Sequence, residues 1–395
     1  MKSYSSPPPE RVGARLYFIG FPEDVEPRLF LEMEQVSSVA LQILFPLLVE
    51  IGFQAEKKPW LHPGERDSVA IYIDAFATQT FIDRVLRHQP ESEVNQVATL
   101  HLQKGLTLLR ERMGGLDDEA KISDATIGAV LDLATAALFH GDANTAKQHI
   151  RGLGKMTDLR GGLKAFDTNP GLLMEILRCD MSIALFTANE PVFCCRAGSK
   201  LPDFPDQVLS SFDSTECPDF LNALNPNLAE VWRVTRKFCL LVNLATQTRR
   251  QFHPSLIYDS MTSIMYRLLR MVFTNGSCDE TLRLGLLVFT QHIFLQGQQI
   301  RLPSQPLSQW YRIHLRAIDS QRAPTQITLW LLMVGAISLY SVAEEAWLGE
   351  SLRRCMERCN VGSWKDLQYV LKSCMWIPAL DDRVGQQIYE SILPS

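Results

Sequence analysis

The chain lacks the short motifs that mark most enzymes. It has no Gly-x-Ser-x-Gly nucleophile elbow, no His-Glu-x-x-His zinc motif and no Gly-x-x-x-x-Gly-Lys-Ser/Thr phosphate loop. Gly152-Leu153-Gly154 begins like a dinucleotide fingerprint, but Thr157 stands where a third glycine is required. The stretch also follows a predicted helix, whereas the fingerprint follows a strand. We therefore predict no catalytic residue and no cofactor.

Cysteine is absent from the early part of the chain and irregularly spaced afterwards. None precedes Cys179, and no pair has the Cys-x-x-Cys spacing of zinc and redox sites. The chain has nine cysteines, an odd number, and no secretory signal, which together indicate reduced thiols in an intracellular protein. Cys355 and Cys359 are one helical turn apart, but no second ligand pair follows them, so burial explains them better than a metal. We predict no metal site.

A basic surface and a membrane segment are also missing. Lys and Arg number 39 against 44 Asp and Glu, which argues against electrostatic DNA binding by the whole chain. Residues 1–10 are polar and Pro-rich, unlike a signal peptide. No charge occurs between Arg322 and Glu344, but the dense apolar part runs only from Leu329 to Leu339, shorter than the ~20 residues of a membrane helix. We predict a buried core helix there and no membrane partner.

Helical periodicity is what the sequence does contain. Apolar residues recur at intervals of three and four over residues 124–139, and Ser123 or Asp124 can cap the N-terminus of this helix. The pattern predicts a helix with one apolar face turned to a core.

A second helix is predicted directly after the first. Gly141 tolerates a positive φ and ends the first helix, and Asp142 or Asn144 can start the next one. The second helix stops at Gly161-Gly162. So short a connection forces the two helices to lie antiparallel.

The same rhythm continues to the end of the chain. Ser363 and Asp366 form a capping box before another helix, which Pro378 closes. Signals for β-hairpins are weak. We predict an all-α fold, a large multi-helix domain of antiparallel helix pairs that is solenoid-like in part. Further helices are expected at residues 172–186, 228–246, 255–273, 281–295 and 326–347.

Composition also suggests the domain boundaries. Residues 1–38 form a polar, Pro-rich lead-in, and residues 39–395 form the helical domain. Residues 191–226 are loop-rich and leave room for two halves, 39–190 and 227–395. Phenylalanines in this loop indicate that it packs on the surface: Phe193, Phe204, Phe212 and Phe220.

The notable polar cluster consists of His140, Asp142 and His149. A metal would need these side chains to fold back on one another and to find further ligands. Helix capping by Asp142 and ordinary exposure of the histidines explain the pattern better. An enzyme that uses these three residues therefore stays a minor hypothesis.

Several stretches, far apart in the chain, carry a resemblance to a known family. The central ones are Gly141-Asp142, His149-Ile150-Arg151-Gly152-Leu153 and Leu159-Arg160-Gly161-Gly162-Leu163. Before them stand Leu44-Phe45-Pro46 and Trp60-Leu61, and after them Trp330 to Gly335, Ser363-Trp364-Lys365-Asp366 and Trp376. In this order the set resembles the helical regulatory domain of fungal zinc-cluster transcription factors, called the fungal-specific transcription factor domain, over about residues 39–392.

The resemblance implies an all-α regulatory domain, a nuclear location and control of transcription, without catalytic residues. Family members usually carry an N-terminal cluster of six cysteines that holds zinc and places a helix on DNA. This chain has no cysteine before Cys179, so we expect no sequence-specific DNA binding by the chain alone. We expect it to act through other nuclear proteins or a DNA-binding factor, as a cluster-less regulator or as the regulatory half of a truncated factor.

The matched residues also have structural roles that we can predict. Gly161 and Gly162 are expected at a helix end with positive φ, and Gly335 where a neighbour approaches closely. Phe45, Trp60 and Trp364 are expected to be core anchors.

Several functional questions stay open at the level of sequence. The resemblance suggests a metabolic or secondary-metabolite pathway as the regulated target, but names no gene. A small-molecule effector and a homodimer are both open, although no sustained heptad repeat supports a coiled coil. The alternative hypothesis is a helical effector-sensing or scaffold protein outside transcription, which the aromatic-rich helical body would suit.

Overall fold

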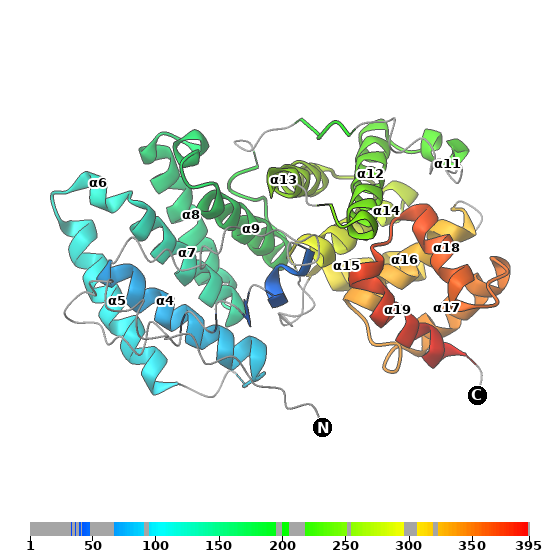
Figure 1. Cartoon of the computed structure of the whole chain (residues 1–395), viewed down its shortest axis with the longest axis horizontal. Coiled ribbons are helices and arrows are strands. Elements are labelled where there is room, and N and C mark those ends of the chain that lie inside the picture. Colours follow the sequence, from blue (N-terminus) through cyan, green and yellow to red (C-terminus); the bar gives the residue numbers. More distant parts are fainter. Residues whose placement is uncertain are drawn as a thin grey trace, which may run out of the picture.

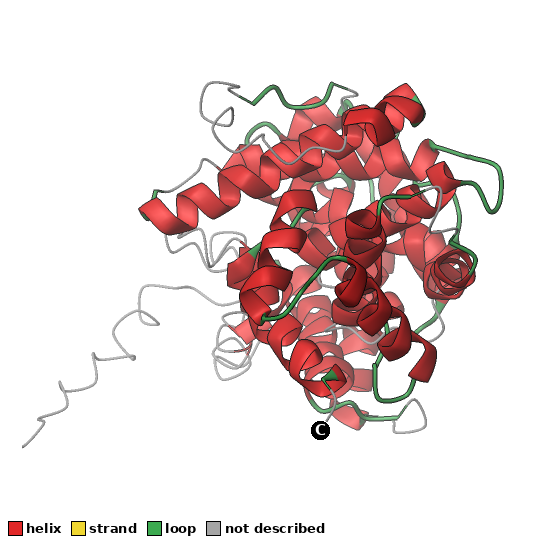
Figure 2. Cartoon of the chain, turned by 90° about the vertical axis from the view of Figure 1, so that its right-hand side faces the viewer, coloured by secondary structure: helices red, strands yellow, loops and turns green. Residues whose placement is uncertain are grey.

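The computed structural model confirms the all-α prediction. It describes residues 33, 36, 39–40, 42–47, 67–90, 95–194, 200–204, 218–250, 254–295, 306–318 and 323–393. Within these ranges the chain folds into helices joined by loops, and no strand occurs (Figure 2). Trp60, Phe212 and most of the expected lead-in lie outside the described residues.

The first helices form the antiparallel pairs that the sequence predicts. They occupy one end of the molecule in Figure 1, where α4 lies beside α5 and α7 beside α8. Their bounds are α4 (Ser68–Phe81), η1 (Ile82–Leu86), α5 (Gln96–Gly114), α6 (Asp118–Lys121), α7 (Asp124–Phe139), α8 (Ala143–Arg160), η2 (Leu163–Phe166) and α9 (Pro170–Thr187).

Side-chain caps fix where these helices begin. Ser123 caps α7, with its Oγ accepting the backbone N–H of Thr126, and Asp142 caps α8. Between them Gly141 has φ 73°, so α7 ends where the sequence predicts. Each cap accepts backbone N–H groups that the first helical turn leaves without a partner.

The later helices occupy the other end of the molecule (Figure 1). Among them, α16 is the apolar helix that we expected to be buried, and all ten residues from Leu329 to Ser338 are buried. Their bounds are α11 (Pro218–Ala223), α12 (Pro226–Thr248), α13 (Pro254–Arg270), α14 (Cys278–Thr290), η4 (Gln291–Leu295), α15 (Pro306–Arg316), α16 (Thr325–Ser338), α17 (Ala346–Arg358), α18 (Trp364–Cys374) and α19 (Pro378–Ile392).

Two sequence predictions about helix ends were wrong. The helix expected over residues 326–347 stops at Ser338. There the backbone N–H of Tyr340 donates a hydrogen bond to the Gly335 carbonyl at 3.0 Å, and the Tyr340 ring covers Gly335. Pro378 does not close α18 but is the first residue of α19, where its missing N–H costs nothing.

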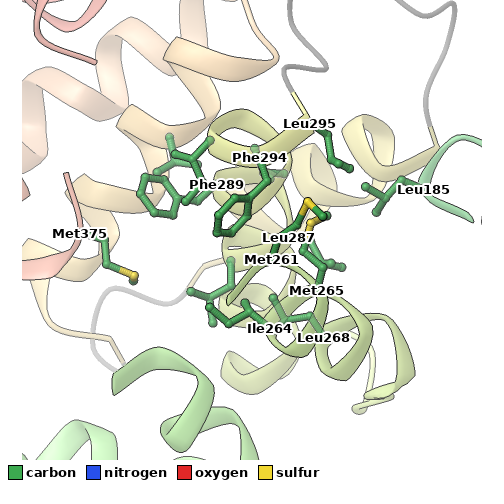
Figure 3. Close-up of a cluster of buried hydrophobic side chains, with 14 of the residues drawn as sticks. Leu185, Met261, Ile264, Met265, Leu268, Leu287, Phe289, Phe294, Leu295 and Met375 are labelled. Carbon is green, nitrogen blue, oxygen red and sulfur yellow. The ribbon is translucent and has the colours of Figure 1, made fainter. Parts of the chain in front are cut away.

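One hydrophobic core runs through most of the described helices. It includes side chains from Phe45 to Ile392, on both sides of the loop-rich residues 191–226, and it takes in Phe193 and Phe204 of that loop. Figure 3 shows part of it, with Leu185 of α9, Met265 of α13 and Phe289 of α14. A second, smaller cluster lies between α4, α5 and α7: Val69, Ile73, Leu109, Ala129 and Leu133.

An extended segment between α18 and α19 crosses the later half of this core. The Met375 carbonyl accepts a hydrogen bond from the Trp330 indole at 2.7 Å. The next carbonyl, of Trp376, accepts from the Asn243 amide of α12 at 2.8 Å. The segment is buried, so its backbone polar groups are satisfied by side chains in place of water.

One helical stretch among the described residues, Asp118–Phe139, is long and apolar enough to cross a membrane by length and composition. Of its most apolar 18-residue window, 56% is buried inside the protein. Core helices of water-soluble proteins pass the same test. The apolar helix Thr325–Ser338 is shorter than a bilayer requires.

Candidate functional site

The motif at the end of α8 holds two helix ends together. The Arg160 guanidinium forms an ion pair with Asp124, the first residue of α7, and stands 4.4 Å from the centre of the Phe166 ring. Gly161 and Gly162 have φ of 111° and 85°, so the chain leaves α8 through a conformation that favours glycine. The predicted helix stop is confirmed, and Leu163 then begins η2.

Other matched residues of α8 have different environments. Leu153 is fully buried, whereas His149 is half-buried, and burial lowers the pKa of its imidazole against a smaller opposing effect of the Asp142 carboxylate. A Cβ atom added to Gly152 would meet nothing within 4 Å. Packing therefore explains Leu153 but gives no reason for a glycine at 152.

The matched residues of the tail come together around two glycines. A Cβ on Gly335 would lie 3.1 Å from the Tyr340 ring, which confirms the predicted close approach. Trp364 and Trp376 both face Gly385 of α19, where a Cβ would lie 2.9 and 2.8 Å from their rings. Trp376 is buried and donates its indole N–H to Asp382 at 2.8 Å, whereas Trp364 is half-buried against Tyr389.

The early matched residues contact α9. The Phe45 ring is buried and lies 3.7 Å beneath the Arg178 guanidinium, and Pro46 beside it is half-buried. Arg178 also donates to the Leu44 carbonyl at 3.0 Å. Phe45 is thus a core anchor, as predicted, and its ring also contacts the positively charged Arg178.

The polar cluster His140, Asp142 and His149 does not form a site. Asp142 accepts the backbone N–H of Thr145 at 3.0 Å, and these capping bonds hold the pKa of its carboxyl below the ordinary value. His140 faces away, toward α4, and its Nδ1 accepts from Arg84 Nε at 3.2 Å. Among the described residues no group of three or more His, Cys, Asp or Glu could hold a metal.

The paired cysteines of α17 are also poor metal ligands in this structure. Cys355 is buried and Cys359 half-buried, and burial raises the pKa of both thiols. A metal ligand must be a thiolate, so a raised pKa disfavours binding.

A set of carboxyl groups that we did not predict lies where α4, α7 and α9 meet. Asp74 comes from α4, Asp132 from α7 and Glu175 from α9, and each is half-buried. Loss of hydration raises the pKa of Asp74 and of Glu175 to about 7. The pKa of Asp132 is raised well above its ordinary value by burial and then by the charges of Asp74 and Glu175. We call these three residues the carboxyl cluster.

Arg178 is the cation beside this cluster. Its Nη1 lies 3.6 Å from Glu175, and burial lowers the pKa of the guanidinium. It lines a small cavity of about 20 Å³ together with Phe45, Met174, Tyr258 and Met261. That volume has room for about one water molecule.

The carboxyl cluster is suited to binding and releasing protons near neutral pH. Nucleophilic chemistry is disfavoured, because burial raises the pKa of the neighbouring Cys179 thiol to about 12. The sequence did carry a signal for the cluster. Asp74 is the single acid of α4, and Asp132 is the single acid of α7 after its first residue. Both helices are otherwise largely apolar, whereas an exposed face would normally carry several polar residues.

Comparison with known proteins finds no match to a family model, to a curated protein or to a solved structure.

Proposed function

We propose that the chain is a transcription regulator of the nucleus that acts through partner proteins. The observation that carries this proposal is the ordered set of residues from Phe45 to Trp376, which resembles the fungal-specific transcription factor domain. The all-α fold agrees with what that resemblance implies. Most of the matched residues that the structure describes act as helix caps, helix ends or core anchors, whereas Gly152 and the half-buried His149 have none of these roles.

Action through partners is part of the proposal. The net charge of −5 and the absence of a cysteine cluster ahead of Cys179 both disfavour direct recognition of DNA by this chain. The partner would be another nuclear protein or a DNA-binding factor, and the regulated genes would belong to a metabolic or secondary-metabolite pathway.

A pair of transcript profiles tests the proposal, one after deletion of the chain and one after its overproduction. We expect a compact set of genes that change in opposite directions in the two profiles. A gel-shift experiment with the purified chain should show no sequence-selective DNA retention. Unchanged transcript profiles, or a protein that stays in the cytosol under all conditions, would contradict the nuclear role.

A helical effector-sensing or scaffold protein is the second candidate. The carboxyl cluster favours it, since groups with strongly shifted pKa values often gather at functional sites. A small molecule that binds only the folded chain raises its melting temperature. A ligand-dependent rise together with unchanged transcript profiles would favour this candidate over the regulator.

A further inference from the structure

The α4–α5 pair is attached to the rest of the described structure along a seam with α7. Its hydrophobic cluster is separate from the main core, and Val130 of α7 is the residue that packs against both. We define the seam by the residues of α4, α5 and α7 that face one another. A layer held by a small cluster of its own can open without unfolding the main core.

Polar contacts secure the two ends of the seam. At one end Arg112 of α5 binds Asp67 at 2.7 Å and donates to the Thr126 hydroxyl of α7 at 3.1 Å. At the other end the Arg84 guanidinium donates to His140 at 3.2 Å. An arginine hydrogen bond therefore crosses the seam at each end, while the Arg112–Asp67 ion pair joins α5 to the start of α4 within the pair.

Like charges face each other between those ends. Asp74 of α4 and Asp132 of α7 lie on opposite sides of the seam, near enough that the charge of one acts on the other. Thr78 is the hydrogen-bond partner of Asp74, at 3.4 Å. The charged group that acts on Asp132 from α9 is another acid, Glu175.

We propose that the α4–α5 pair is a pH-responsive layer, which closes on α7 when Asp74 and Asp132 carry protons and opens along the seam when both are ionised. Closure then places neutral carboxyl groups in a half-buried interface, whereas ionisation places two negative charges there. Opening returns both charges to water and separates them.

The direction of the effect follows from proton linkage. Both acids have a pKa that the closed layer raises, so the closed layer binds more protons than the open one. The stability of the layer is full below the ordinary aspartate pKa of about 4 and is lost as the pH rises through about 7 and beyond.

Other titratable groups around the seam also affect how the stability of the closed layer depends on pH. Glu175 adds to the repulsion, and Arg178 beside it acts in the opposite sense. The phenol of Tyr258 and the thiol of Cys179 have raised pKa values and stay neutral in this range. His101 of α5 has a pKa lowered by burial and contacts Tyr72 of α4, so its protonation disfavours this packing within the pair at low pH. His140 faces the seam from the end of α7, where its ring contacts Arg84 and Phe76.

Hydrogen exchange on the full chain at pH 6 and pH 8 tests the proposal. Opening constants for amides of α4 and α5 are obtained after correction for intrinsic exchange rates, with α18 amides as the internal reference. The variants are Asp132→Asn and Asp74→Asn, which keep the side-chain shape and remove the charge. Glu111→Gln is the matched control, because Glu111 is an exposed acid on α5.

Comparison with the variants at each pH cancels the contribution of His101. The ratio of the wild-type opening constant to that of Asp132→Asn should rise at least about tenfold from pH 6 to pH 8, since one unit of pKa shift is worth tenfold in an equilibrium. Asp74→Asn should act in the same direction, and Glu111→Gln should match the wild type. A ratio that stays constant for both Asn variants, or an equal change in α18, would overturn the proposal.

Discussion

The helices at the two ends of the molecule are joined by different kinds of interaction. Around α4, α7 and α8, ion pairs and caps join the helix ends, and acids lie half-buried between them. Around α12, α14 and α16, aromatic rings pack against one another, with Trp330 in contact with both Trp232 and Phe289. The first end should therefore respond most to charge and proton binding, and the second to changes in side-chain volume.

The largest expected effect is at Trp330. Its ring is fully buried, so Trp330→Ala should lower the free energy of unfolding by about 3–5 kcal/mol through lost burial and a cavity. Urea denaturation measures this. Trp310→Ala removes a ring that is 47% exposed and should cost far less. Equal losses in the two variants would show that the later half is not held by close packing.

A smaller loss is expected when a methyl group is added between two tryptophans. The Cβ of Gly385→Ala would lie under 3.0 Å from the rings of Trp364 and Trp376. The rings must shift, which should cost about 1–3 kcal/mol. Near-ultraviolet circular dichroism should also change, because the indole environments change. An unaltered spectrum and stability would mean that the rings move freely.

In the first half, backbone conformation should matter more than volume. Gly161→Ala places a side chain at φ 111° and should cost about 1 kcal/mol, as left-handed conformations do for residues other than glycine. Gly152→Ala, inside α8 with open space around it, should be neutral or stabilising. Comparison of the melting temperatures of the two variants tests this. The prediction fails if Gly152→Ala lowers the melting temperature more than Gly161→Ala does.

The smallest effect that we expect is an acid sensitivity shared by both halves. Burial lowers the pKa of His149 in α8 and of His314 in α15, so the folded chain binds fewer protons than the unfolded one. The stability that these two groups contribute is therefore full above the unfolded pKa of 6.5 and is lost as the pH falls below it. The urea midpoints of His149→Gln and His314→Gln should each rise relative to the wild type as the pH falls from 7 to 5. A difference from the wild type that does not change with pH would refute the histidine origin.

The sequence predicts the helices of the first half well because their ends are local. The bounds of α7 follow from Ser123 and Gly141, which act through backbone groups within a few residues. The break after Ser338 is also local, since Tyr340 bonds back to Gly335 five residues earlier, but it was missed because residues 336–347 contain no Gly or Pro to mark a helix end.

The candidate site was harder to predict than the helices. The carboxyl cluster needs three helices to place Asp74, Asp132 and Glu175 near one another, and their sequence separation gives no hint of that. A single acid in an apolar helix was visible, but its partners depend on how the helices pack. Conversely, His140 and Asp142 are near in sequence and face different neighbours in the fold.

The extended segment after α18 bears on the order in which the protein is made. Asn243 leaves the ribosome 133 residues before Trp376, the residue whose carbonyl it binds. At a synthesis rate of about 5–20 residues per second, this delay is on the order of ten seconds. During that interval α12 is exposed without the helices that later cover it. A chaperone that shelters apolar helices would therefore have a defined period in which to act on this chain.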